Sequence, residues 1–155
     1  MKIVEPVIQQ YGDLLFDLCE SVLWSPVTAQ VAFRSIIKTI RKQKASHGFE
    51  EHKRAWVLQI ACEKLLPLSE RHGRRLTSSE QIQLDATENV PSRLKQFDSY
   101  FHRLVTEDQI LLLLRDKYGL PYPEIASALG MPEGTLKTRR TQALRNLEEW
   151  LWDRT

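Results

Sequence analysis

Cysteine is scarce in the chain, and no long apolar run occurs. Only Cys19 and Cys62 are present among the 155 residues, each inside an apolar helical pattern, with no CxxC motif and no histidine at metal-ligand spacing. We therefore expect two buried, reduced thiols and neither a disulfide nor a bound metal. The chain contains no run of about 18 apolar residues, the length needed to span a bilayer. The start, MKIVEPVIQQYGD, reaches Pro6 and acidic residues before any long apolar stretch, unlike a signal peptide, so a cytoplasmic protein without membrane contact is expected.

The chain also lacks the groupings of residues that catalysis requires. Its four histidines are scattered over loop and helix positions, with no matched carboxylate or nucleophile. They are His47, His52, His72 and His102. A glycine-rich phosphate-binding loop is absent as well. An enzyme is therefore disfavoured, and we expect no catalytic residue, no cofactor and no small-molecule substrate.

Positive charge is concentrated near the C-terminus. The net charge of +2 is too small to indicate a nucleic-acid partner by itself, so the distribution of charge has to carry that argument. Residues 134–145 contain Lys137, Arg139, Arg140 and Arg145 but no acidic residue. The acidic residues that flank this window are Asp116, Glu124, Glu148, Glu149 and Asp153. One helix-length segment is thus strongly basic in an almost neutral chain.

Apolar residues recur at spacings of three and four through most of the chain, which predicts helices and no strands. In the first half we expect helices over residues 11–24, 26–42 and 51–66. Ser25 followed by Pro26 is typical of a helix start. Residues 44–51 should form a turn, and Pro67 should end the third helix.

The second half begins after a polar segment. Residues 67–90 have no sustained apolar period and are interpreted as a flexible linker. Helices are then expected over 91–104, 106–118 and 123–129, followed by a final helix to about residue 152. Thr106 and Gln109 fit a capping box at the start of the second of these. The predicted fold class is all-α, with two small helical domains, residues 1–66 and 91–155, the second of which contains a helix-turn-helix.

A helical wheel divides the last helix into two faces. With Leu136 at zero and about 100° per residue, several apolar residues fall within about 80° of it and should pack on the domain. They are Ala143, Leu144, Leu147, Trp150 and Leu151. The other face carries residues suited to hydrogen bonds with phosphates and base edges: Thr135, Lys137, Thr138, Arg139, Thr141, Gln142 and Arg145. Arg140 falls on the packing side despite its charge.

The residues around the start of this helix favour a helix-turn-helix. Gly130 suits a sharp turn, and the small side chain of Ala126 permits close helix crossing. Gly134 lets backbone amides come close to a phosphate at the helix N-terminus. We therefore favour DNA binding by the basic face; a solvated charged face on a bundle helix is the alternative.

Residues 106–147, and especially LLLLRDKYGLPYPEIASALGMPEGTLKTRRTQAL, resemble region 4 of bacterial extracytoplasmic-function (ECF) sigma factors. The shared pattern runs from a leucine-rich helix ending in Arg-Asp, through Glu-Ile-Ala and Leu-Gly, to Pro-x-Gly-Thr-x-Lys-x-Arg. In that family the domain binds the −35 element of the promoter. The resemblance implies a DNA-facing set of Gly134, Thr135, Lys137, Thr138 and Arg139, to which the basic face adds Gln142 and Arg145.

The first half is similar to region 2 of the same family. KRAWVLQIA, residues 53–61, matches part of the helix used for −10 recognition and strand opening. The resemblance implies −10 contacts for Lys53, Arg54, Trp56 and Gln59. Because Trp56 also lies on the apolar stripe, core packing is favoured for it over base stacking. The helix after Ser25 stands where the family contacts core polymerase, which implies contacts through Gln30, Phe33, Arg34 and Ile37.

Two hypotheses about function follow from the resemblance. The first is an ECF-type sigma factor that directs promoter-specific initiation, with promoter DNA, RNA polymerase core and an anti-sigma factor as partners. Family members usually carry an acidic motif of the Asp-Leu-Val-Gln-Glu type in the second helix, whereas residues 30–35 of this chain read QVAFRS. The second hypothesis is therefore a sigma-like regulator without initiation activity, which acts through protein partners, for example as an anti-sigma decoy, or as a DNA-bound regulator.

Overall fold

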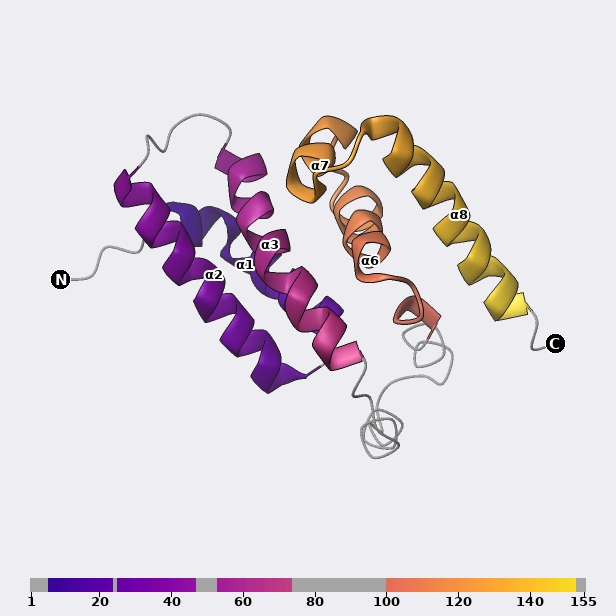
Figure 1. The fold of residues 1–155 in the computed structure, drawn as a ribbon, viewed down its shortest axis with the longest axis horizontal. Helices are drawn as coiled ribbons and strands as arrows, with labels where there is room; N and C mark the ends of the chain where they lie inside the picture. The colour runs from indigo at the N-terminus through magenta and orange to yellow at the C-terminus, as the bar shows by residue number, and fades with distance from the viewer. Residues whose placement is uncertain (1–5, 24, 47–52, 74–99, 153–155) are drawn as a thin grey trace.

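The described part of the chain is built from helices only. A computed structural model describes residues 6–23, 25–46, 53–73 and 100–152, and no strand occurs in them. The helices are α1 (Pro6–Leu23), α2 (Pro26–Ser46), α3 (Lys53–Gly73), α6 (Thr106–Leu112), α7 (Tyr122–Leu129) and α8 (Glu133–Trp152), as Figure 1 shows. A π-helical turn, η1 (Leu113–Lys117), continues α6. The predicted all-α fold is confirmed.

The beginning of α2 is the predicted one, but the end of α3 is not. Ser25 Oγ accepts a hydrogen bond from the Thr28 amide at 3.3 Å, so Ser25 caps the helix that Pro26 begins. Pro67, however, lies inside α3, which continues to Gly73. A proline removes only one backbone hydrogen bond, and Leu66 and Leu68 beside it pack against the core. Residues 67–73 of the predicted linker are therefore helical, and the remainder of that linker lies outside the described residues.

The capping box predicted for α6 is wrong, although the helix does begin at Thr106. The cap position is Val105, which makes no side-chain cap hydrogen bond. Gln109 is buried and its Nε2 donates instead to the Leu104 carbonyl at 2.8 Å. Of the helix predicted over 91–104, residues 91–99 lie outside the described residues, while Tyr100 and Phe101 are helical.

The two halves of the chain share one apolar core. In Figure 1, α3 runs beside α7 and α6, and α3 packs against both. Ile125 of α7 and Leu136 of α8 belong to the same buried cluster as Leu58 and Leu65 of α3. A second, smaller cluster lies between α6 and the C-terminal part of α8 and consists of Tyr100, Phe101, Leu104, Leu112, Ala143 and Leu147. The first half of the chain therefore packs, through α3, against the helices α6 and α7 of the second half.

The two thiols lie in this shared core, as predicted. Cys19 and Cys62 are free and buried. Burial, with a smaller contribution from a neighbouring glutamate, raises the pKa of each thiol to about 12. At neutral pH both should react very slowly with a disulfide reagent in the native protein and rapidly in denaturant, which a colorimetric thiol assay measures. Fast labelling of either thiol in the native protein would contradict this expectation.

Asp17 of α1 joins the two halves through polar contacts. Its carboxylate accepts a hydrogen bond from Lys117 Nζ at 2.7 Å and another from the Tyr118 hydroxyl. Burial acts to raise the pKa of Asp17, but the hydrogen bonds from Lys117 and Tyr118 outweigh it and lower the pKa below its ordinary value. The His102 ring makes a further link, from its Nε2 to the Ser21 carbonyl oxygen at 2.7 Å.

The lowered pKa of Asp17 has a consequence for stability in acid. A carboxyl whose pKa is depressed in the folded state stabilises the fold above its unfolded-state pKa, and this contribution is lost as the pH falls through the folded-state value. We therefore expect the free energy of unfolding to fall below about pH 4, and to fall less steeply in Asp17→Asn. Urea denaturation over a pH series measures both slopes; identical slopes would show that Asp17 contributes nothing.

Candidate nucleic-acid interface

A left-handed glycine sets the turn between α7 and α8. Gly130 has φ 69°, a conformation that side chains with a Cβ rarely adopt. Its amide donates to the Ala126 carbonyl at 2.8 Å, and the Met131 amide donates to the same oxygen at 3.2 Å. α8 then starts with the Leu136 amide bonded to the Pro132 carbonyl at 3.1 Å. The bend predicted at Gly130 is confirmed, and it fixes the direction of α8.

The packing face of α8 is narrower than the wheel indicates. Leu136, Ala143 and Leu147 are buried, as predicted. Leu144 and Leu151 are 38% and 37% exposed, so their predicted burial is wrong. Both lie well to one side of Leu136 on the wheel, and α8 contacts α6 and α7 along a strip that excludes this edge. Trp150, which is partly buried, packs on the small cluster next to Tyr100.

Most of the predicted DNA-facing residues are exposed on α8. Gly134, Thr135, Lys137, Thr138, Gln142 and Arg145 are all exposed. The space beside Gly134 is open, because a Cβ built there would meet no atom within 4 Å. Arg139 differs: it is half-buried, and its Nε donates to Asp108 Oδ1 at 2.7 Å. Six of the seven are thus exposed on α8, and the seventh is attached to α6.

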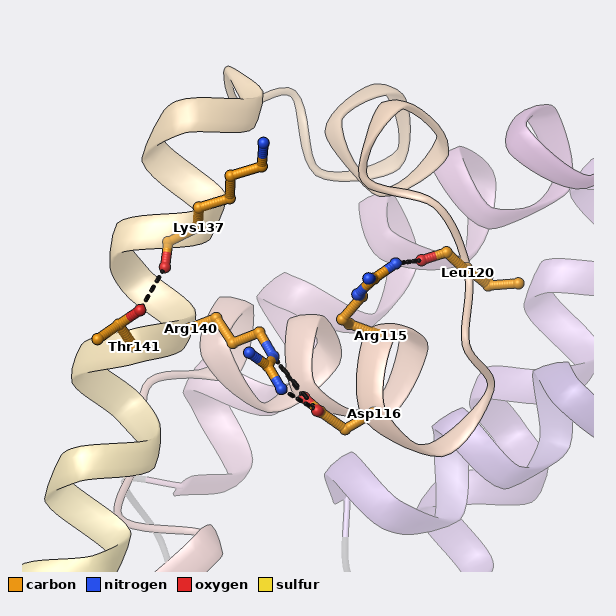
Figure 2. Close-up of polar contacts among 6 residues, drawn as sticks. All are labelled: Arg115, Asp116, Leu120, Lys137, Arg140 and Thr141. Carbon is orange, nitrogen blue, oxygen red and sulfur yellow. Dashed lines mark hydrogen bonds and ion pairs between the residues drawn. The ribbon is translucent and has the colours of Figure 1, made fainter.

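Several polar groups on this surface already have partners within α8. The Thr138 hydroxyl donates to the Gly134 carbonyl at 3.1 Å. The Thr141 hydroxyl donates to the Lys137 carbonyl at 3.0 Å, as Figure 2 shows. Gln142 Nε2 donates to Asn146 Oδ1 at 3.0 Å. These contacts leave the hydroxyl oxygens as acceptors and hold the side chains close to the helix. They can be exchanged for contacts with a ligand at little cost, because the groups are exposed.

Lys137 and Arg140 lie one turn apart but have different environments. Figure 2 shows Arg140 reaching Asp116, with Nε donating to Oδ2 at 3.0 Å and Nη2 donating to Oδ1. Lys137 extends toward α7, where its Nζ lies 5.4 Å from the centroid of the Tyr122 ring. No ion pair of Lys137 occurs within the described ranges. The prediction that Arg140 belongs to the packing side is confirmed, and Lys137 keeps its charge available.

The predicted −10 residues do not form a comparable surface. Arg54 of α3 donates to Glu124 of α7 through Nε and Nη2, both at 2.6 Å. Trp56 is half-buried against the core, in agreement with the packing role, while Gln59 is exposed. The side chain of Lys53 lies outside the described residues. The Arg54–Glu124 pair joins residues 70 apart in sequence, and no local pattern indicated it.

The predicted polymerase contacts on α2 divide between surface and core. Gln30 and Arg34 are exposed. Phe33 is partly buried and packs edge-on against Phe16, with ring centroids 5.4 Å apart. Ile37 is 6% exposed and belongs to the core. Gln30 and Arg34 are therefore the exposed members of this set, and Phe33 is accessible only in part.

Neither metal ligation nor membrane insertion is indicated in the described ranges. No group of three or more His, Cys, Asp or Glu side chains there could hold a metal ion. No described helix is long and apolar enough to cross a membrane. What the surface offers is hydrogen-bond donors and positive charge on α8.

Comparisons with known proteins agree with this geometry. Residues 94–147 match the family model described as Sigma-70, region 4. The fold of the sigma factor RpoE from Bartonella quintana, solved in complex with the anti-sigma factor NepR, matches with TM-score 0.71 and 18% identity, over 93% of each chain. CnrH, solved in complex with the cytosolic domain of CnrY, matches with TM-score 0.71 and 18% identity, over 94% of this chain and 84% of CnrH. No curated protein matches significantly in sequence. The resemblance to sigma factors is thus confirmed by a region 4 segment and by a sigma-factor fold.

Proposed function

We propose that the chain is an ECF-type sigma factor that directs promoter-specific transcription initiation and reads the −35 element with α8. The observation that carries the proposal is the surface of α8, where Lys137 and Arg145 stand exposed on a helix whose direction Gly130 fixes. A helix entering the major groove needs an apolar back, small residues for close approach and cations for phosphates. Gly134, Thr135, Thr138 and Gln142 complete the proposed contact set.

Arg139 can contact DNA only if its ion pair with Asp108 opens. Asp108 competes with DNA for its guanidinium, so contact with a phosphate requires that the Arg139–Asp108 pair open. The pair is partly exposed, and ion pairs of this kind contribute little net stability. A phosphate placed nearby can therefore replace the carboxylate.

The N-terminal half would engage polymerase and the −10 region. Gln30 and Arg34 are the exposed members of the polymerase contact set predicted on α2. Arg54 can contact −10 DNA only after it leaves Glu124, and Glu124 lies on the first helix of the helix-turn-helix. Engagement of −10 DNA through Arg54 thus requires that the Arg54–Glu124 pair open.

A second candidate function has its own support. Because α2 lacks acidic residues and α3 packs on α7, the chain also fits a sigma-like regulator that acts through protein partners without initiating transcription. The solved complex of RpoE with an anti-sigma factor leads us to propose an anti-sigma partner for this chain as well.

In vitro transcription separates these functions. The purified chain is added to core polymerase with fragments of genomic DNA, and the start sites of the transcripts are mapped. A parallel pull-down measures whether the chain binds core polymerase. Discrete new start sites that depend on the chain support the sigma factor proposal. No association with core under conditions where a control sigma factor binds would overturn it in favour of the second candidate.

A further inference from the structure

α2 carries only positive charge. Between Pro26 and Ser46 there is no Asp or Glu. Its charged residues are Arg34, Lys38, Arg41, Lys42 and Lys44. Lysines in the last turn complement the helix dipole, which accounts for the cations at the C-terminal end. Arg34 and Lys38 lie more than one turn before that end, so the dipole does not account for them.

Two of these cations continue an exposed apolar strip. Val27, Val31, Arg34 and Lys38 are spaced by four, three and four residues and therefore lie along one face of the helix. Val27 is 72% exposed and Val31 is 57% exposed. Arg34 and Lys38 are exposed too, and neither has an ion-pair partner in the described ranges. We call these four residues the α2 strip.

The α2 strip lies far from the proposed DNA-binding surface. α2 packs on α1 and α3. In Figure 1, α2 is at one edge of the molecule and α8 is at the opposite edge, with α3, α6 and α7 between them. A ligand on the α2 strip would therefore leave α8 accessible.

The two valines and two cations of the α2 strip suit an acidic protein segment better than a nucleic acid. Phosphates of a nucleic acid would pair with Arg34 and Lys38 but would leave Val27 and Val31 in water. A protein segment that carries apolar residues next to carboxylates uses both halves of the strip. Burial of the valines removes apolar surface from water, and the carboxylates gain partners and speed association.

We propose that the α2 strip is the docking surface for an acidic amphipathic helix of another protein. Its apolar side chains cover Val27 and Val31, and its carboxylates pair with Arg34 and Lys38. Arg34 also belongs to the polymerase contact proposed above, and a protein that binds at this position must present acidic groups to it. It does not rest on DNA reading by α8, because no residue of α8 takes part.

A designed peptide probe tests the proposal on the full chain. The probe is a fluorescein-labelled helix of about five turns with two leucines and two glutamates at the spacing of the α2 strip, and a matched peptide has lysines in place of the glutamates. Binding is followed by fluorescence anisotropy. We expect the glutamate peptide to bind, and Arg34→Glu with Lys38→Glu to weaken it by about tenfold or more. The same double variant should bind the lysine peptide instead.

Two controls exclude a general charge effect. Lys137→Glu with Arg145→Glu makes the same change of charge on α8 and should leave binding of the glutamate peptide nearly unchanged. Val27→Ser with Val31→Ser keeps all charges and should weaken binding. Circular dichroism checks that each variant keeps its helicity, which is expected because all six positions are exposed.

Three results would overturn the proposal. The first is no binding of the glutamate peptide to the unmodified chain. The second is equal weakening by the α2 and α8 charge variants. The third is weakened binding of labelled single-stranded DNA by the α2 charge variant with no effect of the valine changes, which would identify a nucleic-acid surface. None of these results bears on DNA reading by α8, and failure of that function leaves the peptide experiment interpretable.

Discussion

Leu136→Ala should lower the free energy of unfolding by about 2–5 kcal/mol. Leu136 has no exposed surface and lies in the core that α3, α7 and α8 share. Truncation to alanine loses the transfer free energy of the removed atoms and leaves a cavity whose walls belong to several helices, so the site cannot collapse easily. Because that core also contains residues of the first half, the whole molecule should be affected and not only α8.

Leu144→Ala is the matched control for this prediction. Leu144 is on the same helix and has the same side chain, but it is 38% exposed. Its replacement should cost less than about 1 kcal/mol. Urea denaturation followed by circular dichroism measures both variants, and similar slopes with denaturant would show that the unfolded states are comparable. Equal losses at the two positions would contradict the packing described for α8.

The contrast between these two leucines shows what periodicity can predict. The repeat of apolar residues correctly located α8 and its direction of packing, because burial of one face is a property of the helix itself. The width of that face depends on the helices opposite, which no repeat within α8 encodes. α6 and α7 cover Leu136 and Ala143 but stop short of Leu144 and Leu151.

Pro67 illustrates a second limit of local rules. Proline disfavours the interior of a helix, and the prediction that α3 ends there follows from that preference. The preference is a local energy of a few kcal/mol, and apolar packing on both sides of Pro67 opposes it. The turn at Gly130 was predicted correctly, because glycine adopts the left-handed backbone conformation easily and no packing interaction opposes that preference.

The contacts between the halves were the least accessible to prediction. Arg54 and Glu124 are 70 residues apart, and Asp17 and Tyr118 are 101 apart. Each of these residues looks like an ordinary surface residue in its own helix. Their partners depend on how α1 and α3 pack against α6 and α7, and the pattern within either half does not encode that packing. The resemblance to a sigma factor located the α8 surface but did not indicate that Arg54 is held by the helix-turn-helix.

These pairs affect which cations are available for DNA. Of the basic residues concentrated in 134–145, Arg140 is bound to Asp116 and Arg139 to Asp108. Lys137 and Arg145 have no ion pair within the described ranges, and both are exposed. A count of basic residues in the sequence therefore overstates the number of cations that are available to bind DNA phosphates. Lys137 lies nearest the turn and next to Gly134, where the amides at the start of α8 also face outward.

Lys137→Ala should consequently weaken binding to promoter DNA by about 1–3 kcal/mol and reduce the salt dependence by about one counterion. Arg140→Ala removes the same charge one turn away. Because Arg140 is paired with Asp116 and not with a phosphate, its loss should lower the affinity for DNA much less. Fluorescence anisotropy with a −35 fragment, taken from a start site mapped by transcription and measured over a salt series, gives both quantities. Equal losses for the two variants would mean that only net charge matters. Loss for Lys137→Ala alone, with unchanged helicity, would mean that α8 presents a defined surface to the groove and that Asp116 keeps Arg140 out of it.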